Sequence, residues 1–213
     1  YKIYNVNKPL FETLEGATIK NLTLENVNLL GANSKGSISN VAQNTTISNV
    51  HIKGLDMTTG TNESGGMVGD MQSGCTVEES SVTKLHIKLD HIRVAAIAGK
   101  FDGSTIKDCY VEGIIESITS TRDGVGGIAG DGWGTADATI ANCIAKIEFV
   151  NNTRAKNNGG ILGLVRNNKV TLTNNISLCT GTGVNKICGT AMNSASTNNY
   201  ELEESELISN ASG

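Results

Sequence analysis

A five-residue phrase of glycine and aliphatic residues returns along this chain about every thirty residues. Four clear copies are present, followed by a degenerate copy: Gly65-Gly66-Met67-Val68-Gly69, Ala95-Ala96-Ile97-Ala98-Gly99, Gly126-Gly127-Ile128-Ala129-Gly130, Gly159-Gly160-Ile161-Leu162-Gly163 and Asn185-Lys186-Ile187-Cys188-Gly189. Counted at the second residue, the steps are 30 (66 to 96), 31 (96 to 127) and 33 (127 to 160). A period of this length indicates a repeat architecture, in which similar coils stack along one axis.

A second phrase keeps the same phase and extends the repeat toward the N-terminus. It consists of Thr, an aliphatic residue, any residue, and then an acid or an amide. Its copies are Thr18–Asn21, Thr46–Asn49, Thr76–Glu79, Thr105–Asp108, Thr139–Asn142 and Thr171–Asn174. Stacking of the coils should align the aliphatic residues of these copies into one buried column. The predicted column is Ile19, Ile47, Val77, Ile106, Ile140 and Leu172.

The composition and the local alternation favour strands over helices. Apolar and polar residues alternate around Leu85, Ile87 and Leu89, as in a half-buried strand. The residue that ends each threonine phrase should turn a corner, because Asn and Asp tolerate left-handed backbone angles. We therefore expect an all-β, parallel, right-handed β-solenoid of about six coils, forming a single domain over residues 1–213.

Charge and hydropathy narrow the classes of partner. The net charge is −4 and no basic stripe is present, so nucleic acid is not an expected partner. No apolar run approaches the ~20 residues of a membrane span, and the N-terminus lacks a charged-then-apolar signal. Because Tyr1 opens part-way into a coil and the C-terminus lacks a polar cap, we expect a monomeric piece of a longer protein.

The five cysteines permit two interpretations. Cys109 and Cys143 both lie four residues after a repeat threonine, so they should stack in adjacent coils. The favoured interpretation is a column of buried free thiols, since free cysteine behaves as a small apolar residue. A disulfide between the two coils is the alternative, because neighbouring strands lie within disulfide reach.

Residues with the spacing of a catalytic or metal site are not found. The histidines are His51, His86 and His91, and none stands in an H-E-x-x-H arrangement. No cysteine pair has the C-x-x-C spacing of a zinc site. We therefore expect no catalytic residues, no metal and no cofactor in this segment.

The turn between the two phrases is the expected contact surface, because it varies most in length. Its longest copy, 131–137, carries the only tryptophan, and the candidate contact residues are Asp131, Trp133 and Asp137. Loops on one face of a solenoid often carry binding, and tryptophan is a favoured interface anchor. The alternative is that Trp133 folds back as a packing plug.

The glycine phrase, in this phase with the threonine phrase, resembles the GLUG repeat, named for its Gly-Leu-aliphatic-Gly core. The matching cores are Gly66-Met67-Val68-Gly69, Ala96-Ile97-Ala98-Gly99, Gly127-Ile128-Ala129-Gly130 and Gly160-Ile161-Leu162-Gly163. The opening, 9–22, is similar to coils that accompany this repeat. The resemblance implies a bacterial secreted or surface protein, notably the region upstream of the catalytic domain in immunoglobulin-A-specific zinc metallopeptidases of streptococci. It transfers no catalytic residue to this chain.

Two functional classes follow from these observations. The first is a non-catalytic spacer and binding module, an adhesin stalk included, whose partner is a host glycoprotein such as immunoglobulin A or the catalytic domain of the parent protein. The second is a β-helix lyase or hydrolase acting on polysaccharide. Such enzymes need a cluster of acids and a basic residue on one sheet face. The arginines here share no repeat phase with an acid cluster, which favours the first class.

Overall fold

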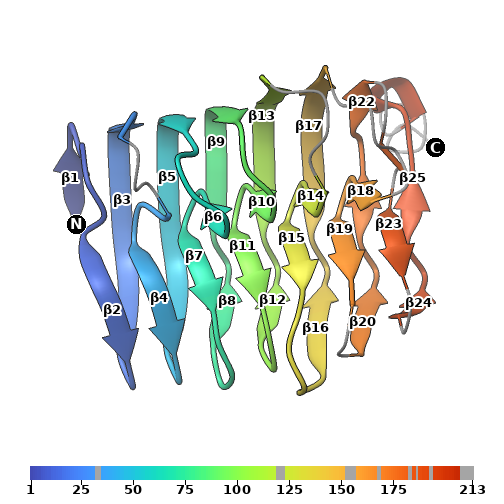
Figure 1. Ribbon diagram of the computed structural model, residues 1–213, viewed down its shortest axis with the longest axis horizontal. Coiled ribbons are helices and arrows are strands. Elements are labelled where there is room, and N and C mark those ends of the chain that lie inside the picture. Colours follow the sequence, from blue (N-terminus) through green and yellow to red (C-terminus); the bar gives the residue numbers. More distant parts are fainter. Residues whose placement is uncertain are drawn as a thin grey trace.

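The computed structural model describes residues 1–31, 35–118, 123–151, 157–166, 169–181, 184–185, 187–191 and 194–206. The chain winds into a parallel β-solenoid whose coils stack along the long axis of the molecule (Figure 1). Every strand pair in these residues is parallel. The predicted all-β solenoid is confirmed. No helix in this part of the chain is long and apolar enough to cross a membrane.

Two of the sheets contain the strands that begin and end the glycine phrase. In the described residues, the larger has seven strands: β2 (Phe11–Glu15), β4 (Ser39–Gln43), β7 (Val68–Met71), β11 (Ala98–Phe101), β15 (Ala129–Gly132), β19 (Leu162–Val165) and β23 (Cys188–Ala191). The smaller has four: β6 (Ser64–Gly65), β10 (Val94–Ala95), β14 (Val125–Gly126) and β18 (Asn158–Gly159). These two sheets have seven and four stacked strands, so the coil count differs slightly from the predicted six.

The third sheet bends at the end of each threonine phrase and so covers two sides of the coil. On one side lie the phrase strands β8 (Thr76–Glu78), β12 (Thr105–Lys107), β16 (Ala138–Ala141), β20 (Val170–Thr173) and β24 (Ser194–Thr197). On the other lie β1 (Lys2–Tyr4), β9 (Ser81–Leu89), β13 (Tyr110–Ser117), β17 (Ile144–Val150), β21 (Ile176–Ser177), β22 (Thr180–Gly181) and β25 (Tyr200–Glu201). The long strands β3 (Thr18–Leu29) and β5 (Thr46–Thr58) run through the bend.

The bend is made by the polar residue that ends each threonine phrase. These residues adopt left-handed backbone angles in consecutive coils: Asn21 (φ 57°), Asn49 (φ 53°), Glu79 (φ 51°), Asp108 (φ 54°), Asn142 (φ 55°) and Asn174 (φ 56°). Their side chains also link neighbouring coils, since the Nδ2 of Asn49 donates to the Oδ1 of Asn21 at 2.8 Å. The predicted corner ladder is confirmed.

The aliphatic column also follows the predicted register. Ile19 aligns with Ile47, and the alignment continues through Val77, Ile106, Ile140 and Leu172. The five inner members are at most 1% exposed. The prediction of full burial is wrong for Ile19, which is half-buried. Among the described residues, its segment of β3 pairs with β5 only, so no second coil covers it.

The last glycine of the phrase allows a sharp reversal of the chain within each coil. A Cβ at Gly130 would lie 2.5 Å from the carbonyl oxygen of Gly99 and 2.7 Å from that of Gly124. A Cβ at Gly99 would meet the backbone of Glu63 and Ser64 just as closely. The short strands of the four-stranded sheet therefore fold directly over the seven-stranded sheet. Glycine is required at these positions because the backbones approach so closely.

The cysteines are free thiols. Cys75, Cys109, Cys143 and Cys179 are buried, and Cys188 is half-buried. Burial raises the pKa of Cys143, and its neighbour Cys109 raises it further. The favoured interpretation, a column of buried free thiols, is confirmed, and Cys109 and Cys143 form no disulfide.

Candidate functional site

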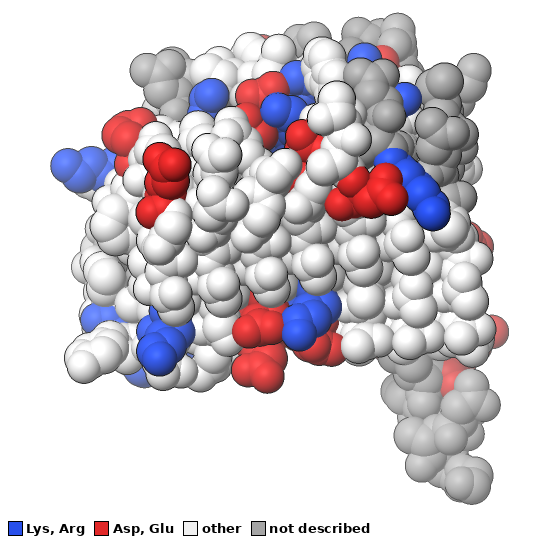
Figure 2. Space-filling model, turned by 90° about the horizontal axis from the view of Figure 1, so that it is seen from below, with Lys and Arg blue, Asp and Glu red and all other residues white. Residues whose placement is uncertain are grey.

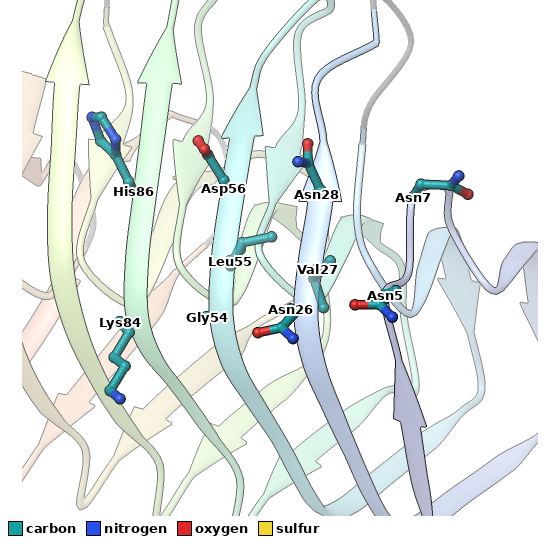
Figure 3. Close-up of a pocket in the computed structure, with 10 residues that line it drawn as sticks. All are labelled: Asn5, Asn7, Asn26, Val27, Asn28, Gly54, Leu55, Asp56, Lys84 and His86. Atoms are coloured by element: carbon teal, nitrogen blue, oxygen red, sulfur yellow. The ribbon is translucent and has the colours of Figure 1, made fainter.

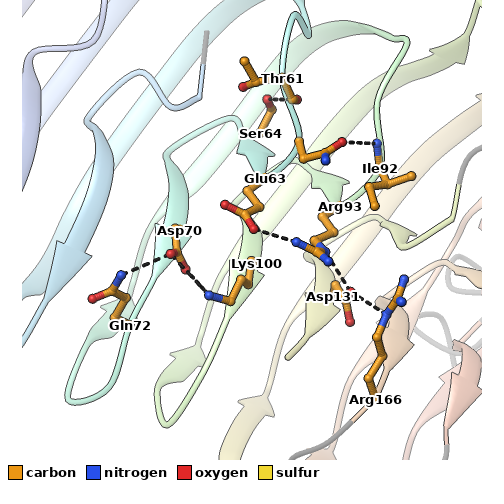
Figure 4. A network of polar contacts seen from close by, with 11 residues as sticks. Thr61, Glu63, Ser64, Asp70, Gln72, Ile92, Arg93, Lys100, Asp131 and Arg166 are labelled. Atoms are coloured by element: carbon orange, nitrogen blue, oxygen red, sulfur yellow. Dashed lines mark hydrogen bonds and ion pairs between the residues drawn. The ribbon is translucent and has the colours of Figure 1, made fainter. Parts of the chain in front are cut away.

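A charged cluster lies over the glycine phrases of successive coils. We define it as Glu63, Arg93, Asp131, Arg166 and Trp133 (Figure 4 draws its four charged members). Arg93 bridges two acids: its Nη1 lies 2.6 Å from the Oε1 of Glu63, and its Nε lies 3.2 Å from the Oδ2 of Asp131. The Nε of Arg166 approaches the same Oδ2 at 3.0 Å. One carboxylate oxygen therefore holds two guanidinium groups.

The repeat brings these residues together from distant parts of the sequence. Glu63 and Arg93 each precede a glycine phrase, in a left-handed backbone conformation (φ 67° and 63°), and they are aligned in neighbouring coils. Asp131 directly follows the last glycine of a later phrase, on β15. The chain reversal at the glycine phrase folds the segment before the phrase over the strand after it. Side chains that precede one phrase therefore meet a side chain that follows another. The cluster depends on that reversal.

Asp131 is fully buried, in spite of its charge. Removal from water raises the pKa of its carboxyl, and the guanidinium groups of Arg166 and Arg93 oppose this shift. Its second oxygen, Oδ1, is buried without a hydrogen-bond partner. The buried carboxylate holds the two arginines in place. Because it is not accessible itself, a partner protein would contact the arginines instead.

Trp133 lies against the guanidinium groups that Asp131 holds. The Cζ of Arg93 is 3.7 Å from the centroid of the tryptophan ring, and the Cζ of Arg166 is 5.4 Å away. Such cation–π contacts contribute about 0.5–2 kcal/mol, more when they are shielded from water. Trp133 is half-buried, whereas Asp137 at the end of the turn is exposed. The ring has an intramolecular packing role, and part of it remains accessible.

A second pair of opposite charges lies next to the cluster. The Nζ of Lys100 is 3.2 Å from the Oδ1 of Asp70, and Gln72 donates to the other oxygen of Asp70 at 3.1 Å. Asp70, Lys100 and Asp131 are aligned on β7, β11 and β15. Sequence reasoning missed this column. Its signal is visible, because the residue after the last glycine alternates in charge through three consecutive copies.

Other ionisable groups make smaller sets of contacts: Lys146 lies 3.4 Å from Glu112 and 2.8 Å from Glu204. His86 lies 3.2 Å from Glu116, and His51 lies between Ser81 and Asn49 at 2.9 and 2.8 Å. Over the described ranges, no group of three or more His, Cys, Asp or Glu side chains could hold a metal ion. In the face shown in Figure 2, uncharged atoms predominate and no continuous basic band is visible. Within the described residues, the charged cluster is therefore the largest group of paired charges.

Comparison with known proteins places this chain beside one group of bacterial enzymes. Residues 1–54 match the family model described as the M26 IgA1-specific metallo-endopeptidase N-terminal region. The immunoglobulin A1 protease of Streptococcus sanguinis is 33% identical over 171 residues, covering 76% of this chain and 9% of that protein. That of Streptococcus pneumoniae serotype 4 is 28% identical over 204 residues, covering 76% of this chain and 10% of that protein. The chain thus spans about a tenth of the length of these relatives, and the family match is to their N-terminal region.

Proposed function

We propose that this chain is a non-catalytic β-solenoid of an extracellular or surface-attached bacterial protein related to immunoglobulin A1 proteases. In this proposal it separates other domains of the parent protein and offers a contact surface. The partner is a host glycoprotein, with immunoglobulin A as the first candidate, or the catalytic domain of the parent. The observation that carries the proposal is the match of residues 1–54 to an N-terminal region, combined with similarity along most of the chain.

The fold supports a spacer role on physical grounds. In a solenoid each coil contacts only its neighbours, so the length of the module grows with the number of coils. The core column of aliphatic side chains continues from coil to coil without interruption through the register of β3, β5, β8, β12, β16 and β20. Such a body can hold a partner at a fixed distance from another domain.

The charged cluster argues against the alternative of a polysaccharide lyase. That chemistry needs a basic side chain free to accept a proton near an acid cluster that binds a cation. Arg93 and Arg166 are both committed to the buried Asp131, and Arg93 also pairs with Glu63. Their pairing leaves neither as an available base.

The activity test uses the purified chain with immunoglobulin A1 and with polysaccharides, in the presence and absence of Zn²⁺ and Ca²⁺. We expect no cleavage of either substrate by mass spectrometry, and measurable binding of immunoglobulin A1 or of the parent's catalytic domain by biolayer interferometry. Metal-dependent turnover by an inhibitor-checked preparation would overturn the proposal. Absence of binding to both partners would reduce it to the spacer role alone.

The contact surface is tested by Trp133→Ala, with Asp137→Ala as the exposed control on the same turn. If Trp133 is an interface anchor, its loss should weaken binding by about 2 kcal/mol or more with little change in melting temperature. If it serves as a packing plug on Arg93, the melting temperature falls and binding by the folded fraction persists. The second result would move the contact surface away from this turn.

A further inference from the structure

A trench crosses the outer face of the bent sheet over β3, β5, β9 and the residues that follow β1 (Figure 3). It encloses a hollow of about 690 Å³. One wall is a row of aligned residues with left-handed backbone angles: Asn5 (φ 57°), Asn26 (φ 58°), Gly54 (φ 79°) and Lys84 (φ 52°). These angles kink the four strands at one level and so hollow the surface.

The opposite wall is a second row, two residues further along each strand. It consists of Asn7, Asn28, Asp56 and His86, and the register aligns Asn28 with Asp56 and Asp56 with His86. Between the rows, Val27 and Leu55 point into the core, with exposures of 2% and 1%. The row of polar groups ends at the next strand, where Ile114 is aligned with His86. The trench therefore runs along the solenoid axis for about 14 Å, three strand spacings of ~4.8 Å.

Among the described residues, most polar side chains of the trench have no partner, unlike the amides at the corner and in the core. At the corner, Asn142 donates to Asp108 at 2.9 Å, and in the core Asn175 donates to Asn199 at 2.8 Å. By contrast, the trench side chains other than His86 have no hydrogen bond or ion pair with any described residue. They are Asn5, Asn7, Asn26, Asn28, Asp56 and Lys84.

Asparagine suits the left-handed positions 5 and 26, but it is an unfavourable choice for position 28 in β3. It is depleted in strands, where β-branched and aromatic residues fit better. Yet the tripeptide Asn-Val-Asn occurs twice, at 5–7 and at 26–28. The first copy follows β1 and lies beside the second copy, which is in β3. The middle valine serves the core, while both amides face outward. The pattern places four amides on one surface, and only Asn5 and Asn26 among them have the left-handed angles that favour asparagine.

The chemistry of the trench fits an uncharged ligand that is rich in hydroxyl groups. Each amide offers two donors and an acceptor oxygen, at any pH. The charges of Asp56 and Lys84 cancel, and His86 is in contact with Glu116, so the trench has no excess of one charge to select anions or cations. A hydroxyl group both donates and accepts, which matches amide rows on two sides. We propose that the trench binds a neutral oligosaccharide whose chain lies along the solenoid axis.

The site is tested on the whole chain with a glycan array that carries neutral, sialylated and sulfated oligosaccharides of two to six residues. We expect binding to be confined to neutral glycans. The best neutral oligosaccharide is then titrated by calorimetry, and by NMR of the asparagine side-chain amide signals. We expect the signals of Asn26 and Asn28 to shift, and those of the corner residue Asn142 to stay in place.

Two variants probe the trench, and a third serves as the control. The double change Asn26→Ala and Asn28→Ala removes two amides and should weaken affinity roughly tenfold or more. Gly54→Asn should narrow the trench at this wall with little backbone strain, since asparagine already occupies the aligned position 26 with the same hand of φ. Glu148→Ala changes an exposed residue beyond Ile114 in the same row and should leave binding intact.

Three outcomes would overturn the proposal. The first is an array without binding to any neutral glycan at millimolar concentration. The second is selective binding of charged glycans or of extended peptides. The third is a neutral-glycan affinity that is unchanged in a folded Gly54→Asn protein. Since these measurements involve neither immunoglobulin cleavage nor Trp133, failure here leaves the proposed function untouched.

Discussion

The aliphatic column makes a graded prediction about stability, best tested at Ile106 in its centre. This side chain is 0% exposed and lies between Val77 and Ile140 in the register. Ile106→Ala removes three carbon atoms, which at about 0.8 kcal/mol each is worth about 2.4 kcal/mol of transfer free energy. The cavity left behind adds to this, so the free energy of unfolding should fall by about 2–5 kcal/mol.

Two further substitutions provide the comparison. Ile106→Val keeps most of the volume and should cost about 0.5–1.5 kcal/mol. Ile19→Ala makes the same chemical change in the half-buried end member of the column, which contacts a neighbouring coil on one side. It should cost clearly less than Ile106→Ala, because less apolar surface returns to water and the site can relax into solvent.

Urea denaturation followed by circular dichroism measures all three changes. The free energy of unfolding should fall most for Ile106→Ala and less for Ile19→Ala and Ile106→Val. The denaturant slopes should be similar, so that the midpoints report stability. Equal costs at Ile19 and Ile106 would refute the idea that stacking from both sides sets the cost. A midpoint unchanged by Ile106→Ala would refute burial of the column itself.

Three other predictions concern the reversal, the charged cluster and the thiols. Gly130→Ala should destabilise the protein by about 1–3 kcal/mol or more in the same urea assay, because its Cβ would collide with backbone, whereas Gly31→Ala, with open space around it, should not. Asp131→Asn should cost about 3 kcal/mol in thermal unfolding, because it leaves the buried Arg93 with one partner fewer; an unchanged melting temperature would contradict this. Cys143 should resist a thiol reagent at pH 8 until the protein unfolds, because burial raises its pKa; rapid reaction of the native protein would contradict this.

The sequence was sufficient to predict the features that every coil must share. The corner at Asn21, the inward column through Ile106 and the close approach at Gly130 recur in each copy, because stacked coils impose the same geometry at the same position. Periodicity exposes such requirements directly, and strand stacking then fixes the register. The one error in this set, full burial of Ile19, arose because a periodic pattern treats end and middle coils alike.

The contacts of the charged cluster could not be predicted in the same way. Arg93 and Asp131 are 38 residues apart, and their pairing requires the segment before one glycine phrase to fold over the strand after another. That reversal is a tertiary feature, which the repeat phase alone does not reveal. Trp133 was singled out by its rarity, yet its position over Arg93 became visible only in three dimensions.

The positions that the solenoid leaves free are the places to look for function. Core and corner residues are dictated by stacking, so they carry no information about a partner. The residue after the last glycine is not the same from coil to coil: it is Asp70, Lys100 and Asp131 in three coils and Leu164 in the next. The Asn-Val-Asn pairs are a second departure, since only their middle residue serves the core. If the module were a spacer alone, the amides of Asn7 and Asn28 would not be needed for its fold. Replacing these two residues by Thr, which suits an exposed strand, should therefore separate the two roles, because a pure spacer would keep its stability and lose nothing else.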